Sequence, residues 1–222
     1  MKMFSIIKQV GIINFIKAGI NELHRKIVRE YINGSYAQDY EDLEIEKNMG
    51  KKIGYYVEIG AYHPTRISNT YRFYKKGWKG IVVEPNPNIK SLFEKIRSRD
   101  RFVNIGVGTK NGQIKYYMYD IPALNTFSKK QTEINRKNGF VYSETKNIEI
   151  VDIELFLKQN IDRSIDLLSL DVEGWDEKIL NRWNWTFKPK VICVENPDVK
   201  ELLTNQGYKF KQQTRYNSIY VL

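Results

Sequence analysis

The sequence predicts an α/β fold built on a mostly parallel β-sheet, and three patterns carry this prediction. From residue 55 onward, short apolar runs of strand length alternate with segments whose apolar side chains recur at helical spacing. Nearly every apolar run ends in a carboxylate or an amide residue. The last two runs follow one another without a helix, which predicts a closing antiparallel pair. We therefore expect a sheet covered by helices on both faces.

Strands and helices are expected to alternate along most of the chain. Two glycines mark ends, because Gly60 follows the first strand and Gly77 stops the first helix. The expected strands are 55–59, 80–83, 102–107, 113–119, 148–153, 165–170, 191–194, 208–212 and 218–222. The expected helices are 66–76, 89–96, a short one capped by Asp152 that runs through Leu157, 175–180 and 199–203.

Composition limits the classes of protein that the chain can represent. With 222 residues, 41% of them hydrophobic, it can form one sizeable domain plus an extension. The single cysteine, Cys193, lies in an apolar run, where it predicts a buried thiol in the reducing cytoplasm. The formal net charge of +10 suits an anionic partner, which leaves nucleic acid, an anionic membrane and a phosphorylated small substrate open.

The first 30 residues carry apolar side chains at roughly helical spacing. Lys8 and Lys17 interrupt them, so we expect no membrane-spanning helix and no cleavable signal. One or two amphipathic helices are predicted, which pack on the domain or on a second copy in a homo-oligomer. Lying on a membrane surface is the alternative.

Polar residues gather where the predicted strands end. In a parallel sheet the ligand binds at the carboxyl ends of the strands, so these residues are the candidate site. A sheet built for stability alone has no need of them, because burying carboxylates costs free energy. The strand ends read Glu58-Ile59-Gly60, Glu84-Pro85-Asn86, Asn104-Ile105, Asp171-Val172-Glu173-Gly174 and Glu195-Asn196.

The first two strand ends indicate a cofactor that carries a ribose and no phosphate. The chain has neither a Gly-x-Gly-x-x-Gly fingerprint nor a Walker loop. The motif Glu58-x-Gly60 offers a single turn glycine, which lets the backbone pass closely beneath a ligand. Glu84, at the end of the next strand, can accept hydrogen bonds from ribose hydroxyls. S-adenosylmethionine fits this arrangement better than NAD.

Six short blocks of the sequence, in this order, resemble the FkbM methyltransferase family. The likeness runs from about Ser35 to about Pro197, with a matching lead-in from Ser35 to Asp42, and is faint between Gly108 and Lys146. The blocks are Val57-Glu58-Ile59-Gly60-Ala61, Ser68-Asn69-Thr70, Gly77-Trp78-x-Gly80, Glu84-Pro85-Asn86-Pro87, Ser169-Leu170-Asp171-Val172-Glu173-Gly174 and Val194-Glu195-Asn196.

The resemblance implies a class I methyltransferase fold, Rossmann-like, with a seven-stranded sheet and S-adenosylmethionine as methyl donor. We expect residues 35–222 to form the methyltransferase domain and 1–34 a helical extension. The resemblance also implies O-methylation, commonly of sugars or natural-product hydroxyls. The donor contacts that it implies are Glu58 and Gly60 at the methionine end, Glu84 and Pro85 at the ribose, Asn104 and Ile105 at the adenine, and Gln38 and Thr70 nearby.

The later strand ends supply candidates for catalysis. Asp171, Glu195 and Asn196 offer hard oxygen ligands that suit Mg²⁺ or Mn²⁺, and they can equally bind sugar hydroxyls without a metal. His63 follows the first strand and is either a further ligand or the general base. Glu173 either hydrogen-bonds the acceptor or caps the helix that follows.

The acceptor that we expect is a sugar hydroxyl on a nucleotide-activated sugar or a glycan precursor, as in polysaccharide biosynthesis. A nucleic-acid methyltransferase is the first alternative, and the positive charge favours it. However, the chain lacks the Asn/Asp-Pro-Pro-aromatic motif of amino-directed enzymes after the fourth strand of the sheet, so we expect no nucleic-acid partner. A non-catalytic binding protein on the same fold is the second alternative.

Overall fold

A computed structural model describes residues 17, 19–21, 23, 25–50, 52–140, 142–172, 174–195 and 197–222. These residues form two compact units, one of 35–112 with 150–222 and one of 1–34 with 113–149. The predicted division into an extension, 1–34, and a domain, 35–222, stays a prediction. Among the described residues, no helix is both long and apolar enough to cross a bilayer.

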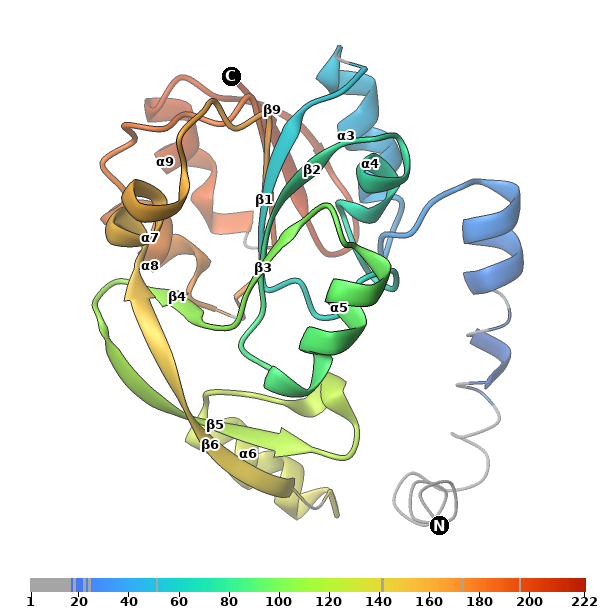
Figure 1. Cartoon of the computed structure of the whole chain (residues 1–222), viewed down its shortest axis with the longest axis vertical. Coiled ribbons are helices and arrows are strands. Elements are labelled where there is room, and N and C mark those ends of the chain that lie inside the picture. The colour runs from blue at the N-terminus through green and yellow to red at the C-terminus, as the bar shows by residue number, and fades with distance from the viewer. Residues whose placement is uncertain are drawn as a thin grey trace. The chain divides into compact units, whose positions relative to one another are not determined.

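The larger unit is built on a seven-stranded sheet, shown in Figure 1. Its strand order is β3-β2-β1-β7-β8-β10-β9. The first five strands in this order are parallel, and β10 pairs antiparallel with both of its neighbours. The strands are β1 (Tyr55–Ile59), β2 (Lys79–Val83), β3 (Arg101–Val103), β7 (Leu167–Leu170), β8 (Val191–Val194), β9 (Lys209–Gln213) and β10 (Ser218–Val221).

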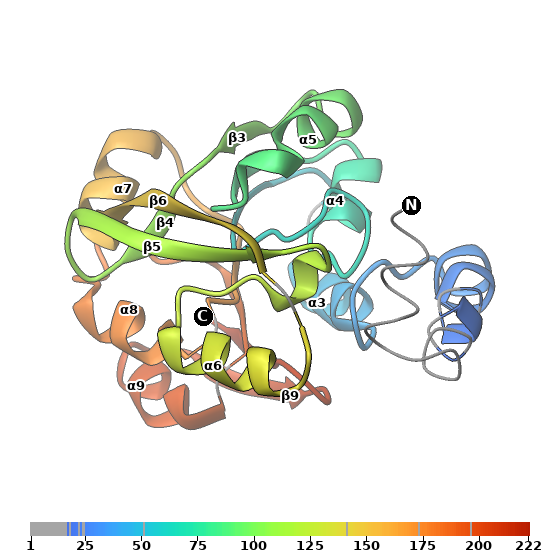
Figure 2. The same ribbon diagram turned by 90° about the horizontal axis from the view of Figure 1, so that it is seen from below.

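Helices cover both faces of this sheet, as Figures 1 and 2 show. On one face, Val57 and Ile59 belong to a core that includes side chains of α7, α8 and α9. On the other face, Tyr56 and Val82 pack with side chains of α3, α4 and α5. The helices are α3 (Glu41–Met49), α4 (Tyr71–Lys75), α5 (Lys90–Ile96), α7 (Ile153–Asn160), α8 (Asp176–Arg182) and α9 (Lys200–Asn205), with short 3₁₀ turns at Pro87–Ile89 and Pro197–Val199.

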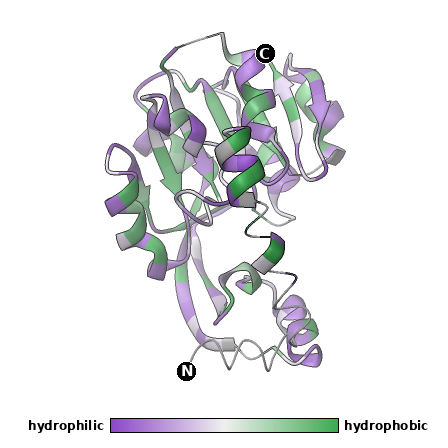
Figure 3. Cartoon of the chain, turned by 90° about the vertical axis from the view of Figure 1, so that its right-hand side faces the viewer, coloured by the Kyte–Doolittle hydropathy of each residue, from purple (hydrophilic) through white to green (hydrophobic). Residues whose placement is uncertain are grey.

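The alternation of side chains along each strand explains why the sheet is buried on both faces. Consecutive residues point to opposite faces, so a strand covered on both sides must be apolar throughout. All four residues of β7 and all four of β8 are buried. In Figure 3 the strands of this sheet are mostly hydrophobic, while the helices carry hydrophilic faces.

A second sheet has three strands in the order β4-β6-β5. Within the larger unit, β4 pairs in parallel with the end of β6, and Gly108 lies opposite Asp152. The smaller unit holds most of β5 and β6, a helix, a 3₁₀ turn and a helical segment with π-type turns. These elements are β4 (Gly106–Gly108), β5 (Gly112–Tyr119), β6 (Tyr142–Asp152), α6 (Lys129–Lys137), the turn Pro122–Leu124 and the segment Arg25–Ile32.

The fold confirms the predicted sheet and closing antiparallel strand, while several elements differ from the prediction, and helices α3 and α6 lie where none was predicted. The expected strand 102–107 is two strands, because the Asn104 side chain turns back and donates to the carbonyls of Glu84 and Pro85. The expected helix 66–76 begins only at Tyr71. The predicted cap of α7 is confirmed, since Asp152 accepts a hydrogen bond from the Glu154 backbone N–H.

Candidate active site

The carboxyl ends of four neighbouring strands meet at one edge of the seven-stranded sheet. Ile59 lies opposite both Val83 and Leu170, and Leu170 lies opposite Val194. The residues that follow these positions therefore share one edge, about 4.8 Å apart from strand to strand. We call Gly60, Glu84, Asp171 and Glu195 the rim.

Gly60 allows the chain to turn closely at this edge. Its φ of 84° lies in the left-handed region, which residues with a side chain rarely adopt. A Cβ at this position would lie 1.8 Å from the carbonyl oxygen of Asp171. The Gly60 and Ala61 amides both donate to the Val83 carbonyl at 3.0 Å. The predicted turn glycine is thus required by the approach of β7 as well as by its own backbone conformation.

Glu84 organises the loop around it through backbone groups. Its side chain is buried, and its two oxygens accept from the Tyr62 N–H at 2.9 Å and the Asn86 N–H at 2.7 Å. Asn104 donates to the carbonyls of Glu84 and Pro85 at 2.7 and 3.0 Å. The structure therefore brings Glu84, Pro85, Asn104 and the adjoining Ile105 together beside the Gly60 turn.

Glu58 lies one position before Ile59, so its side chain points to the face of the sheet that carries α3, α4 and α5. There it is 3% exposed and accepts hydrogen bonds from the hydroxyls of Ser68 at 3.2 Å and Thr70 at 2.6 Å. Arg97 adds an ion pair at 3.0 Å. Burial raises the pKa of Glu58 above its ordinary value, while Arg97 acts in the opposite direction.

Arg97 connects Glu58 to a wider set of side chains, which we call the buried network. Its guanidinium bonds Asp100 at 2.6 Å, the Thr70 hydroxyl at 2.7 Å and the Tyr56 hydroxyl at 3.0 Å. The predicted donor contacts Glu58 and Thr70 thus have partners inside the protein, and their roles toward a donor stay predictions. The network consists of Tyr56, Glu58, Ser68, Thr70, Arg97 and Asp100.

The motif Ser68-Asn69-Thr70 fastens its loop across three strands. Ser68 and Thr70 bond Glu58 on β1, as described above. Between them, Asn69 donates to the Ser169 hydroxyl on β7 at 3.0 Å and to the Cys193 sulfur on β8 at 3.6 Å. These contacts explain why residues 68–70 are not helical, and they hold the loop against the sheet just below the rim.

His63 lies in the loop that follows Gly60. Its Nδ1 accepts hydrogen bonds from the backbone N–H groups of Thr65 and Arg66, both at 3.2 Å. With Nδ1 accepting, the proton of the neutral ring lies on Nε2, so that atom is a hydrogen-bond donor. This arrangement allows the Nε2–H of His63 to orient the substrate that accepts the methyl group. The predicted role of His63 as a general base stays a prediction.

The acidic side of the rim includes a residue that sequence reasoning missed. Asp176, at the start of α8, is buried and accepts from the Val172 N–H at 3.3 Å. The pKa of Asp176 is raised to about 6, chiefly by burial, with Glu195 acting in the same direction and backbone hydrogen bonds in the opposite one. Its place five residues after Asp171, at the start of a helix, was the available signal.

Two of the predicted residues, Glu173 and Asn196, lie outside the described residues. Asp171 and Glu195 are at matching positions on neighbouring strands, as the metal prediction requires. Over the described part of the chain, no group of three or more His, Cys, Asp or Glu residues is arranged to hold a metal ion. The metal therefore stays a prediction that depends on Asn196.

Gln38 is placed at the same edge of the sheet by its neighbours. Ser218 pairs with Val194, so the turn between β9 and β10 lies at the carboxyl end of β8. This turn bonds the segment before α3, because Asp39 accepts from the Arg215 N–H at 2.8 Å and Glu41 accepts from the Thr214 hydroxyl at 2.6 Å. Gln38 directly precedes Asp39, which fits the predicted donor contact without testing it.

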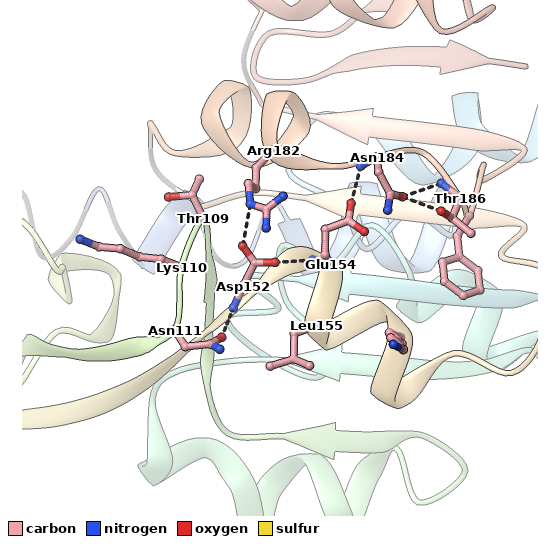
Figure 4. Close-up of a pocket in the computed structure, with 11 residues that line it drawn as sticks. Thr109, Lys110, Asn111, Asp152, Glu154, Leu155, Arg182, Asn184 and Thr186 are labelled. Carbon is pink, nitrogen blue, oxygen red and sulfur yellow. Dashed lines mark hydrogen bonds and ion pairs between the residues drawn. The ribbon is translucent and has the colours of Figure 1, made fainter.

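A separate cavity of about 720 Å³ opens between the segment after β4, the start of α7 and the end of α8. Figure 4 shows its polar lining, in which Asp152 pairs with Arg182 at 2.9 Å and Glu154 accepts from the Asn184 N–H. None of the predicted site residues lines it. The acidic groups of this cavity already bond to neighbouring side chains and backbone. They therefore hold the cavity wall together and offer little for binding a ligand.

The model of the methyltransferase FkbM domain matches residues 58–210. A comparison with curated proteins found no match. Similar solved structures include a methyltransferase from Geobacter sulfurreducens, with 10% identity over 93% of this chain and 90% of that one and a TM-score of 0.47.

Two further similar structures have comparable scores. A precorrin-6y C5,15-methyltransferase from Geobacter metallireducens has 12% identity over 82% of this chain and 88% of that one, with a TM-score of 0.44. A human methyltransferase 10 domain containing protein has 12% identity over 92% of this chain and 94% of that one, with a TM-score of 0.46. The family match spans more than half of the chain and includes the end of β1 and all of β2, β7 and β8. The chain belongs to the FkbM family of S-adenosylmethionine-dependent methyltransferases.

Proposed function

We propose that this protein transfers a methyl group from S-adenosylmethionine to a hydroxyl of a sugar, carried on a nucleotide or a glycan precursor. Methyl transfer follows from the family, whereas oxygen and sugar are the proposal. The observation that carries it is the rim, where a turn glycine, a buried carboxylate and two further acidic residues converge. Such a site suits a ligand rich in hydroxyl donors.

The rim fits the donor in two places: Glu84 suits the ribose of S-adenosylmethionine, and the backbone turn at Gly60 suits its methionine end. S-adenosylmethionine supplies a methyl group on a positively charged sulfur. A carboxylate oxygen accepts more than one hydrogen bond, so Glu84 can hold the loop and bind ribose hydroxyls as well. Gly60 lets the chain pass beneath the methionine end. Further proposed contacts are Gln38, Pro85, Asn104 and Ile105, while Glu58 and Thr70 act on the donor site through the buried network.

In this proposal Asp171 and His63 have different roles toward the substrate that accepts the methyl group. His63 Nε2–H donates to the substrate and orients it, and the Asp171 carboxylate takes the hydroxyl proton. The acceptor oxygen then forms its bond to the methyl carbon while the bond from that carbon to sulfur breaks. Holding these three atoms in line is mainly a positioning task. Glu173 hydrogen-bonds the acceptor.

A divalent cation is the second part of the proposal. Asp171, Glu195 and Asn196 would hold Mg²⁺ or Mn²⁺, whose chemistry is to lower the pKa of a bound hydroxyl. The net charge of +10 also suits the diphosphate of a nucleotide sugar. We place the protein in the cytoplasm, where such sugars are made.

A methyl-transfer screen tests this proposal. The full chain is incubated with methyl-labelled donor and a panel of nucleotide sugars, glycan precursors and RNA, with EDTA or added Mg²⁺. We expect label on a sugar oxygen, lost in EDTA. Asp171→Asn should lower kcat by about 100-fold and leave donor affinity within about twofold. Asp162→Asn, at an exposed aspartate, is the control. Label on RNA or on nitrogen would refute the proposed acceptor.

A further inference from the structure

The N-terminal segment exposes a row of large apolar side chains. Ile20 is 62% exposed, Leu23 is 58% exposed and Ile32 is 66% exposed, and Ile27 between them is also exposed. Ile20 and Leu23 are one helical turn apart. Ile27 and Ile32 lie five residues apart in the segment with π-type turns, where the Asn33 N–H bonds the Val28 carbonyl. The row therefore continues along one side of the segment.

Such a row is unusual on the surface of a soluble protein. Single exposed apolar residues are common, but contiguous ones mark places where another surface binds. Burying each of these side chains would remove a large apolar area from water. We infer that the side chains of Ile20, Leu23, Ile27 and Ile32 are covered in the functional state, and we call their stretch of the chain the apolar row segment.

The charges of the same segment indicate what covers it. Residues 17–32 contain four basic residues and two acidic ones, and exposed Lys17 and Lys26 are among the basic ones. The sequence before residue 17 adds Lys2 and Lys8 and no acidic residue. A second copy of the chain would bring the same positive charge to the interface. An anionic lipid surface instead complements it.

We propose that the apolar row segment docks on an anionic phospholipid membrane and lies in the plane of its interface. The isoleucines and Leu23 enter the boundary between headgroups and acyl chains, and the lysines reach outward to the lipid phosphates. Among the described residues no helix can span a bilayer, which agrees with a surface-bound state. The segment would hold the methyltransferase at a membrane without anchoring it permanently.

Flotation of the full chain with lipid vesicles tests the proposal. We expect binding to vesicles of phosphatidylcholine mixed with phosphatidylglycerol, weakened by salt, and little binding to phosphatidylcholine alone. Ile20→Ser with Leu23→Ser should weaken binding at least about tenfold. Ile53→Ser is the matched control, because this isoleucine is 65% exposed outside the segment.

The charge part has its own pair of variants. Lys17→Gln with Lys26→Gln should weaken binding about fivefold or more. Lys209→Gln with Lys211→Gln removes the same charge from exposed positions on β9 and should change vesicle binding little. Equal binding to neutral and anionic vesicles would overturn the proposal. So would absence of vesicle binding together with a dimer in light scattering that Ile20→Ser and Leu23→Ser dissolve.

Discussion

The buried network and the rim are built from the same kind of residue at the ends of neighbouring strands, yet they are organised differently. Glu58 in the buried network is bonded by side chains, namely two hydroxyls and the Arg97 guanidinium. Glu84 on the rim is bonded by two backbone N–H groups. A carboxylate bonded by a buried cation stabilises the fold. A carboxylate bonded by backbone N–H groups fixes the conformation of a loop instead, and the carboxylate stays directed toward the strand ends.

The largest effect that tests this contrast is expected from Arg97→Met. The Arg97 side chain is fully buried between Glu58 and Asp100, so its loss leaves two buried carboxylates without their cation. We expect the free energy of unfolding to fall by about 3 to 5 kcal/mol, measured by urea denaturation. Arg163→Met, which breaks an exposed ion pair, should leave the midpoint unchanged. A loss below about 1 kcal/mol would contradict the structural role of the network.

The next effect is expected from Gly60→Ala, on the rim. The new Cβ meets the Asp171 carbonyl and the backbone has a positive φ, so we expect a loss of about 3 kcal/mol. Gly139→Ala is a close control, because Gly139 has the same φ of 84° with no atom within 4 Å of the added Cβ. It should lose about 1 kcal/mol from backbone strain alone. Equal losses in both variants would show that the contact with β7 is not limiting.

A smaller effect that depends on pH is expected from Asp176. Its pKa is about 6 in the folded protein against an ordinary value of 3.8, so the folded state binds the proton more tightly. Stability should therefore fall as the pH rises from about 4 to about 6, by about 2 kcal/mol. Asp176→Asn should remove this slope and be the more stable form at neutral pH. Parallel slopes in urea unfolding of both proteins would contradict the assignment.

The smallest effects are expected from substitutions that compare the two carboxylates, Glu84 and Glu58, directly. In Glu84→Gln an amide NH₂ faces a backbone N–H, so the loop shifts, and we expect donor affinity to fall about tenfold with little change in stability. Glu58→Gln should do the reverse, with lower stability and nearly unchanged affinity. Titration calorimetry with S-adenosylhomocysteine measures the affinities. Loss of affinity in Glu58→Gln alone would reverse the roles given to the two residues.

The sequence allowed the sheet and the set of strand ends to be predicted, because both follow from local pattern. The direction of Glu58 did not follow from its place near the end of β1. Counting alternate positions from Val57 and Ile59 would have placed it on a face of the sheet instead. Its partner Arg97 comes from the end of α5, and no spacing rule links the two residues.

Other features were missed for different reasons. Helix α6 has a weak apolar pattern, although Ser128 and Gln131 match a capping box and the Ser128 hydroxyl does accept from the Gln131 N–H. The hydrogen bonds at His63 Nδ1 depend on the conformation of the loop and cannot be read from composition. The raised pKa of Asp176 depends on burial, which a sequence does not give.

The pairing of β4 with the end of β6 has a consequence for how such enzymes diversify. Gly108 faces Asp152, and the Asn111 side chain accepts from the Asp152 N–H at 2.8 Å, so the two ends of the stretch 113–149 leave the larger unit side by side. A stretch whose two ends lie side by side can be lengthened, shortened or exchanged while the parallel sheet keeps its register. Evolution can thus vary this stretch without rebuilding the chemistry at the strand ends.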